Sequence, residues 1–282
     1  MIRDDFAIFI ISYNRANNFY TLNTLKKSNY TGKYYILIGK DDPMKNEYLN
    51  LYNEHVVIFD KEKVKPFCDL YDCNGSDKIA TYARNVVFKL AKKLKLNYFA
   101  VFDDDYTSFE YRYASDDKLK VMKSREFDDV CNIFIDFLEE TNSLTVAFAQ
   151  GGDLLGGVHG SDFNNKVKRK AMNSFFCKTT KPFYFFGRTN EDVNMYLYYG
   201  KRGELCFTVV DCSLVQKQTQ VNKGGLSDIY NNEGTYVKSF YSVLSNPSCV
   251  RIDAMAADNP RIHHKINWNN AVPKIINEKY KK

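Results

Sequence analysis

An unbroken apolar run at residues 6–11, Phe-Ala-Ile-Phe-Ile-Ile, stands near the start of the chain and ends in polar residues. Such a run is typical of a strand, here predicted at 7–12, that is buried on both faces of a helix-covered sheet. Further strands and amphipathic helices alternate after it, with strands predicted at 34–38, 56–59 and 98–102 and helices at 17–27 and 78–94. This alternation predicts an α/β fold with a mostly parallel sheet flanked by helices.

The pattern loosens beyond about residue 108. A helix is predicted at 127–138, a strand at 144–148, a glycine-rich loop at 151–160, and a helix at 191–199 between strands at 181–188 and 205–211. The sequence has no internal repeat and no low-complexity linker. We therefore expect a single domain over 1–282 with an elaborated C-terminal half.

Composition excludes several classes of protein. Hydrophobic residues make up 44% and charged residues 26% of the chain, which excludes wholesale disorder. No apolar run approaches the roughly 20 residues of a membrane span, and no signal peptide is recognisable, so a cytoplasmic protein is expected. The seven cysteines lack zinc or redox spacing, which favours reduced thiols. A net charge of +6 permits a nucleic-acid partner without requiring one.

Three consecutive carboxylates, Asp103, Asp104 and Asp105, follow the predicted strand at 98–102. They repel one another unless solvent or a cation neutralises them, and a hard divalent ion is the natural choice. Along an extended chain Asp103 and Asp105 point the same way. An acidic surface turn is the alternative, but a position after a strand that lies in the ligand-binding crevice of an α/β sheet favours function.

Polar residues follow the other predicted strands as well. Ser12-Tyr13-Asn14-Arg15 ends the first strand, and its groups could stack on a base and bind a phosphate, or form an ordinary connection. Asp41 lies in a polar cluster after the second strand. Arg84 and Asn85 interrupt an apolar helix face, so Arg84 is either a solvated or salt-bridged residue or an anchor for phosphate or carboxylate.

These motifs, in this order, resemble the GT-A nucleotide-sugar glycosyltransferases. The resemblance implies a GT-A fold, a UDP-sugar donor, and Mn²⁺ or Mg²⁺ clamping the diphosphate. The resemblance also implies that Tyr13, Arg15 and Asp41 face the uridine, that Asp103 lies near the ribose, and that Asp105 ligates the metal. The whole donor set that it implies is Ser12, Tyr13, Asn14, Arg15, Asp41, Arg84, Asn85, Asp103 and Asp104.

Two later motifs fit the same scheme. Glu191-Asp192 opens a predicted helix, and the resemblance implies that one of them, Asp192 ahead of Glu191, deprotonates the acceptor in an inverting reaction. Acidic residues are also favoured there by the helix dipole. His263 and His264 are adjacent; we expect His263 to complete the metal shell with Asp103 and Asp105, while a structural role for both stays open.

The C-terminal half is similar to that of the TET/JBP-associated glycosyltransferases, which are mostly phage-encoded and thought to glycosylate hydroxymethylated pyrimidines in DNA. The motifs that carry this similarity are Gly224-Gly225-Leu226-Ser227, Glu233-Gly234-Thr235-Tyr236, Asn246-Pro247-Ser248, His263-His264, Trp268 and Pro273-Lys274. The resemblance implies a nucleotide-sugar-binding half over 1–108, an acceptor and catalytic half over 109–282, and double-stranded DNA with hydroxymethylated pyrimidines as the partner.

Some residues agree with a DNA acceptor without demanding one. Gly151, Gly152 and Asp153 suggest a mobile acceptor loop, followed by a basic run that includes Lys168 and Arg169. A base flipped out of the duplex would need aromatic partners. The basic candidates are Lys166, Lys168, Arg169, Lys170, Lys217, Lys223, Lys238 and Lys265, and the aromatic ones are Phe175, Phe176, Phe183, Tyr184, Phe185 and Phe186.

Three other functions stay open at this point. The same chemistry could act on a glycan or a protein side chain. Acidic clusters with histidines also serve metal-dependent nucleases. A non-catalytic DNA-binding module with a degenerate fold would bind DNA in a salt-dependent way and leave sugar donors intact.

Overall fold

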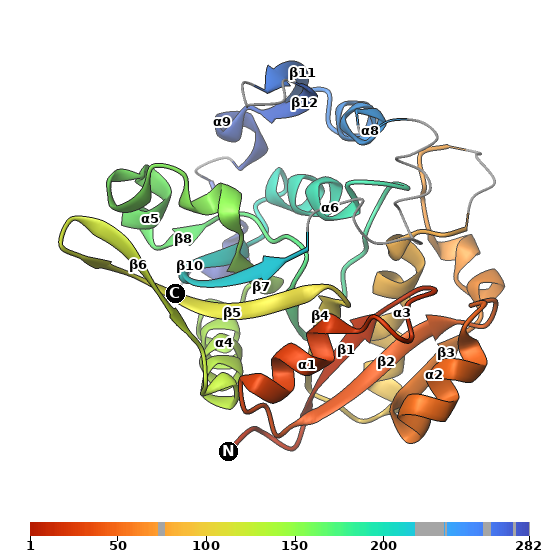
Figure 1. The fold of residues 1–282 in the computed structure, drawn as a ribbon. Coiled ribbons are helices and arrows are strands. Elements are labelled where there is room, and N and C mark those ends of the chain that lie inside the picture. Colours follow the sequence, from red (N-terminus) through yellow and green to blue (C-terminus); the bar gives the residue numbers. More distant parts are fainter. Residues whose placement is uncertain (73–76, 218–233, 235, 256–260, 273–274, 282) are drawn as a thin grey trace.

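A ten-stranded mixed sheet organises the part of the chain that the computed structural model describes, residues 1–72, 77–217, 234, 236–255, 261–272 and 275–281. Its strands run in the order β3-β2-β1-β4-β9-β7-β10-β5-β6, and β8 pairs with β10. A separate two-stranded sheet, β11–β12, lies on the far side of helix α6 (Figure 1). The strands are β1 (Phe6–Ile11), β2 (Lys33–Gly39), β3 (Val56–Phe59), β4 (Tyr98–Asp103), β5 (Tyr106–Ser115), β6 (Lys118–Lys123), β7 (Thr145–Ala149), β8 (Val167–Lys168), β9 (Phe175–Lys178), β10 (Cys206–Gln216), β11 (Val250–Met255) and β12 (Arg261–Ile266).

Helices cover both faces of the large sheet. They are α1 (Tyr20–Lys27), α2 (Lys45–Tyr52), α3 (Ala80–Lys93), α4 (Phe127–Thr141), α5 (Ser161–Asn165), α6 (Glu191–Gly200), α8 (Val237–Ser245) and α9 (Trp268–Ala271). Among the described residues no helix is long and apolar enough to cross a membrane. The six described cysteines are unpaired, as expected, and Cys73 lies outside the described residues.

The predicted α/β fold is confirmed, with one correction to its sheet. Strands β3, β2, β1 and β4 are parallel neighbours, and Ile11 of β1 stands opposite Asp103 of β4. The carboxyl ends of these strands therefore meet at one edge. Beyond β4 most pairs are antiparallel, so the sheet is only partly parallel rather than mostly so.

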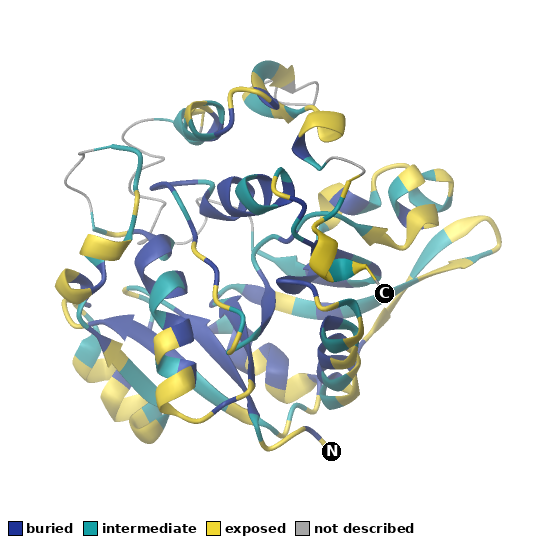
Figure 2. Ribbon diagram, turned by 180° about the vertical axis from the view of Figure 1, so that it is seen from behind, coloured by how far each residue is buried: buried dark blue, intermediate teal, exposed yellow. Residues whose placement is uncertain are grey.

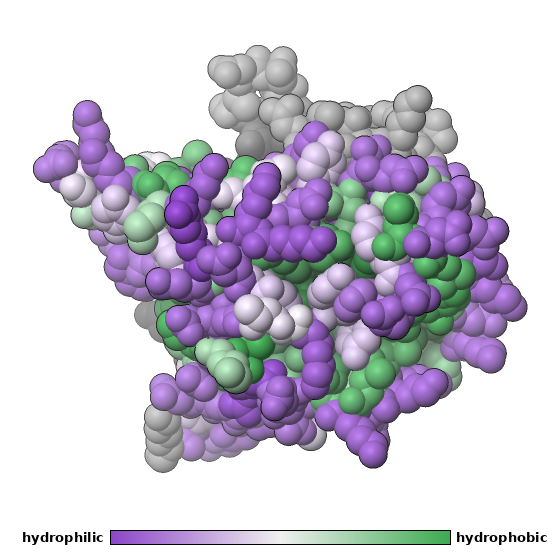
Figure 3. Space-filling model, turned by 60° about the horizontal axis from the view of Figure 1, so that its bottom comes forward, coloured by the Kyte–Doolittle hydropathy of each residue, from purple (hydrophilic) through white to green (hydrophobic). Residues whose placement is uncertain are grey.

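The hydrophobic core has two layers, one on each face of the sheet (Figure 2). Alternate residues of β1 divide between them: Phe9 packs in one layer and Ile8 in the other, and every residue of β1 is buried. This is the two-sided burial that the unbroken apolar run predicts. The lower face of the molecule is mainly hydrophilic, with hydrophobic side chains in patches between polar ones (Figure 3).

The prediction of a strand at 181–188 is wrong. The antiparallel partner of β4 and β7 is β9, a few residues earlier, and residues 182–186 have no regular structure. The pattern also fails to predict α2, the β5–β6 hairpin, and the C-terminal elements α8, β11, β12 and α9. Several motif residues lie outside the described residues: Lys223, Gly224-Gly225-Leu226-Ser227, Glu233, Thr235 and Pro273-Lys274.

Candidate active site

The three carboxylates after β4 have three different environments. Asp103, still in the strand, receives a hydrogen bond of 3.0 Å from Nη2 of Arg84. Its backbone N–H donates to the hydroxyl of Tyr106, which in turn donates to the carbonyl of Asn173. Tyr106 was not among the predicted site residues, yet it fixes the point where β4 ends and β5 begins.

Asp104 is buried and serves the fold. Its carboxylate is 2.7 Å from Nη1 of Arg15 and accepts a hydrogen bond from Ser12. Its backbone carbonyl accepts the N–H groups of Tyr20 and Thr21 at the start of α1. The structure thus joins three residues of the predicted donor set, Ser12, Arg15 and Asp104, in one polar network that connects the ends of β1 and β4.

Asp105 carries an unsatisfied carboxylate oxygen. Its Oδ1 is buried and has no hydrogen-bond partner among the described residues. Burial, together with Asp103 and Asp104 nearby, raises the pKa of Asp105 to about 7. A buried carboxylate next to two others is costly without a cation. The donor set of Asp105 and Asp103, hard oxygen atoms at a strand end, therefore fits a hard divalent metal ion.

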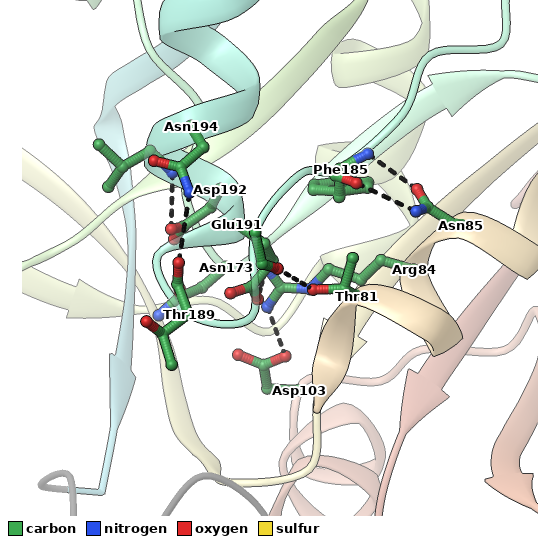
Figure 4. Close-up of polar contacts among 12 residues, drawn as sticks. Thr81, Arg84, Asn85, Asp103, Asn173, Phe185, Thr189, Glu191, Asp192 and Asn194 are labelled. Carbon is green, nitrogen blue, oxygen red and sulfur yellow. Dashed lines mark hydrogen bonds and ion pairs between the residues drawn. The ribbon is translucent and has the colours of Figure 1, made fainter. Parts of the chain in front are cut away.

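Arg84 connects the strand end with the start of α6 (Figure 4). Its side chain is 3% exposed, and its Nη2 and Nη1 lie 3.0 Å from Asp103 and 2.8 Å from Oε1 of Glu191. The rings of Phe175 and Phe185 pack against the guanidinium. Of the alternatives left open for Arg84, the structure shows the salt-bridged residue, because both of its ion pairs are with carboxylates of the chain itself.

Glu191 and Asp192 are both buried at the N-terminus of α6, although carboxylates are rarely buried. Burial raises the pKa of each above its ordinary value, and Arg84 opposes that rise. Glu191 is held by its ion pair with Arg84. The Asp192 carboxylate accepts a hydrogen bond of 2.7 Å from the N–H of Val193 and points away from Arg84 (Figure 4). The acidic pair and the strand-end carboxylates thus belong to one site, with Asp192 farther from the ion pair.

The segment before α6 is held by side chains instead of a neighbouring strand. Asn85 donates to the carbonyl of Phe185 at 3.0 Å and accepts its N–H at 2.8 Å. Thr81 donates to the carbonyl of Gly187 at 2.6 Å, and Asn194 donates to that of Phe186 at 3.0 Å. Asn85 was predicted to bind the donor. In this structure its amide instead hydrogen-bonds the backbone of Phe185 and positions the segment that leads to Glu191.

Tyr13 and Asp41, which follow β1 and β2, both contact Lys61. Nζ of Lys61 lies 2.8 Å from Asp41 and 5.0 Å from the centre of the Tyr13 ring. Buried Asp42 accepts the N–H of Asn14, a residue with a positive φ of 57°. Lys61 and Asp42 were missed by the sequence motifs. A Cβ at Gly39 would come within 2.6 Å of Asp41 Oδ1 and 2.8 Å of Lys61 Cε, so a larger residue there would have to displace these two side chains.

The two histidines lie beside the start of α6. His264 Nδ1 is 3.3 Å from Nδ2 of Asn190, the residue before Glu191, and burial lowers the pKa of His264 to about 3, so the ring is neutral. No three Asp, Glu, His or Cys residues form a metal-binding group within the described ranges. His263 therefore does not join Asp103 and Asp105 in this structure.

The predicted acceptor residues lie at a glycine-rich turn. Gly151 and Gly152 are exposed, whereas Asp153 is buried and 3.2 Å from Nζ of Lys168. Arg169 donates to the carbonyl of Glu204. Each lysine of the basic run is paired with a carboxylate, which offsets its charge: Lys166 with Asp211, Lys168 with Asp153 and Asp162, and Lys170 with Asp153.

The aromatic candidates for stacking on a flipped base are mostly wrong. Four of them are at most 1% exposed and form part of the core: Phe175, Phe176, Phe183 and Phe185. Phe186 packs on Tyr198, and Tyr184 is 49% exposed. Burial of apolar area explains the four better than a ligand does.

Comparison with known proteins completes the description of the site. No curated protein matches the chain at a significant level. The family model for TET-Associated Glycosyltransferase matches residues 6–225, which contain β1, the Asp103–Asp105 triplet and the Glu191–Asp192 pair. Because the match covers most of the chain and these chemical groups, the chain belongs to the TET-associated glycosyltransferase family.

Proposed function

We propose that this chain is a metal-dependent, inverting glycosyltransferase that moves a sugar from a UDP-sugar to the hydroxyl of a 5-hydroxymethylpyrimidine in DNA. The observation that carries the proposal is the buried bridge through Arg84, which brings the strand-end carboxylate Asp103 and the acidic pair of α6 into one site. Family membership makes the chain a glycosyltransferase. It argues against the nuclease and the non-catalytic binding module. The parallel β3-β2-β1-β4 order supports a GT-A fold.

The donor would lie along the carboxyl ends of β1, β2 and β4. Tyr13, Lys61 and Asp41 offer an aromatic face and charged groups for the nucleoside. Asp103 and Asp105 would hold Mn²⁺ or Mg²⁺, and the unpartnered Oδ1 of Asp105 supports this. A bound divalent ion there would neutralise the diphosphate and make it a better leaving group. His263 is left out of this set.

Asp192 is the residue that would take the acceptor proton. The acceptor O–H would give its proton to the Asp192 carboxylate, its oxygen would bond to the anomeric carbon, and the bond from that carbon to the diphosphate would break. Burial raises the pKa of Asp192, which makes its carboxylate a stronger base. Glu191, neutralised by Arg84, would keep the start of α6 in place.

Modified DNA as the acceptor is supported by the family's association with TET. A transfer assay with a UDP-sugar panel and Mn²⁺ tests this, using a duplex that carries 5-hydroxymethylpyrimidines and the same duplex unmodified. Transfer only to the modified duplex is expected. If sugar is transferred to a glycan or a protein but to neither duplex, the acceptor is a glycan or protein side chain instead of DNA.

The Asp192 assignment is tested separately. Asp192→Asn should retain the UDP-sugar-dependent rise in Tm and lose at least 100-fold in turnover, because general bases typically contribute 10²–10⁴-fold. Asp136→Asn, which changes an exposed aspartate of α4 outside the site, is the matched control. Normal turnover in Asp192→Asn would assign the base to another residue.

A further inference from the structure

The outer part of the β5–β6 hairpin, residues 112–123, stands away from the rest of the sheet; we call it the β5–β6 ribbon. β5 pairs with β10 only from Tyr106 to Tyr111, and beyond that point β6 is its only strand partner among the described residues. The ribbon extends past the body of the molecule (Figures 1 and 2). No residue from 110 to 123 is buried. The ribbon is therefore an exposed two-stranded arm.

One face of this arm combines lysines with exposed apolar side chains. Tyr113 stands opposite Lys120, and Met122 and Lys118 share their face because side chains alternate along a strand. Tyr113 is 46% and Met122 54% exposed. Lys120 has a long contact of 3.8 Å with Asp116, and Lys118 forms no ion pair with a described residue.

Protection of a sheet edge explains the lysines of the ribbon but not its exposed apolar side chains. Lysines on an edge strand discourage pairing with other sheets. Exposed Tyr113 and Met122 do the opposite, since they add apolar surface to an edge. A polyanionic partner with grooves accounts for both kinds of residue, because lysines neutralise phosphates while apolar and aromatic side chains contact groove edges.

The ribbon is connected to the proposed active site at one end. β5 begins at Tyr106, directly after Asp105, and ten extended residues span about 30 Å. The Asp117 carboxylate at the tip lies 3.3 Å from Nε2 of His159, next to the glycine-rich turn. One turn of duplex DNA is about 34 Å, so a duplex whose target nucleotide reaches Asp105 could be contacted by the tip roughly one turn away.

We propose that the β5–β6 ribbon lies in a groove of the acceptor duplex and binds its backbone through Lys118 and Lys120, with Tyr113 and Met122 toward the groove. The major groove is wide enough for a two-stranded β-ribbon. This inference rests on the proposed DNA acceptor and adds the surface that holds the duplex outside the reaction site. It moves the search for DNA contacts away from the basic run at 166–170, whose three lysines are paired with carboxylates.

Salt-dependent binding to a fluorescent duplex tests the lysines. Lys118→Gln/Lys120→Gln should reduce the slope of log K against log salt by about 1.8, since each lost phosphate contact removes about 0.9, and weaken binding at 0.1 M salt by about 10- to 50-fold. Lys89→Gln/Lys93→Gln removes the same charge from the exposed face of α3 and should change neither the salt slope nor the affinity at 0.1 M salt by much. Equal effects in the two variants would overturn the proposal.

A second pair of measurements separates the groove contacts from charge. Tyr113→Ser/Met122→Ser should weaken binding at every salt concentration and leave the slope unchanged. Both ribbon variants should keep the Tm and the UDP-sugar-induced stabilisation of the parent, and lose transfer to the duplex. If the parent transfers sugar to duplex DNA and both variants match it, the ribbon proposal alone is wrong. If the parent binds UDP-sugar and no DNA, the acceptor assignment fails, and the ribbon proposal with it.

Discussion

Replacing Asp105 by asparagine should make the metal-free protein more stable at pH 8 while abolishing transfer. The Asp105 carboxylate is buried beside Asp103 and Asp104, and its pKa is raised from 3.8 to about 7. Its folded form thus binds a proton more tightly than its unfolded form, so the stability contributed by the protonated group is complete below about pH 4 and is lost as the pH rises to 7. At about 1.4 kcal/mol per pH unit, the full loss is up to about 4 kcal/mol.

Asp105→Asn keeps the size of the side chain and removes this dependence. Between pH 5 and pH 8 the free energy of unfolding of the variant, relative to the parent, should rise by about 3 kcal/mol. Urea unfolding of both proteins in a chelator, at half-unit steps of pH, measures the difference. Asp116→Asn, at an exposed position of the ribbon, is the matched control and should show no comparable trend.

Adding Mn²⁺ should reverse the order of stability. The metal ion binds the ionised carboxylate and stabilises the folded parent by mass action, more at pH 8 than at pH 5, because protons compete with it. The variant should gain little. A difference between parent and variant that does not change with pH would refute the argument, since Asp105 would then ionise normally. Equal stabilisation of both proteins by Mn²⁺ would remove Asp105 from the metal site.

Two further substitutions test the network around Arg84. Arg84→Met should lower the free energy of unfolding by about 3–5 kcal/mol, because it leaves Asp103 and Glu191 without their buried cation. Arg202→Met, at an exposed position, is the control and should change the free energy of unfolding little. Equal losses in the two variants, measured by chemical unfolding, would contradict the buried bridge. Asn85→Ala should lower the free energy of unfolding by about 1–3 kcal/mol, because it leaves the backbone of Phe185 unpaired. It should also reduce turnover more than UDP-sugar binding. A loss of stability with unchanged kinetics would show that Asn85 serves only the stability of the fold.

The first four strands could be predicted because each is a local apolar pattern. The β5–β6 hairpin could not, because only the first residues of β5 contribute to the core, and the outer part of the hairpin at 112–123 has no buried face to produce a regular alternation. A signal was present in Asp116-Asp117, whose positive φ angles of 53° and 57° form the two-residue turn. The expected strand at 181–188 failed for another reason. Phe183 and Phe185 in this segment are buried, but its backbone is paired with side chains of Thr81, Asn85 and Asn194 instead of a strand.

The sequence by itself determined the α/β character, the carboxylates at the end of β4 and the acidic start of α6, since all of these depend on neighbouring residues. Only the tertiary structure decided which charges meet. Arg84 pairs with Glu191 across more than a hundred residues, and the three lysines of the basic run at 166–170 pair with Asp153, Asp162 and Asp211. Ion pairs form between groups that packing brings within about 4 Å and shields from water. The order of residues along the sequence contains no information about such distances. The sequence therefore identified the charged residues but not their partners.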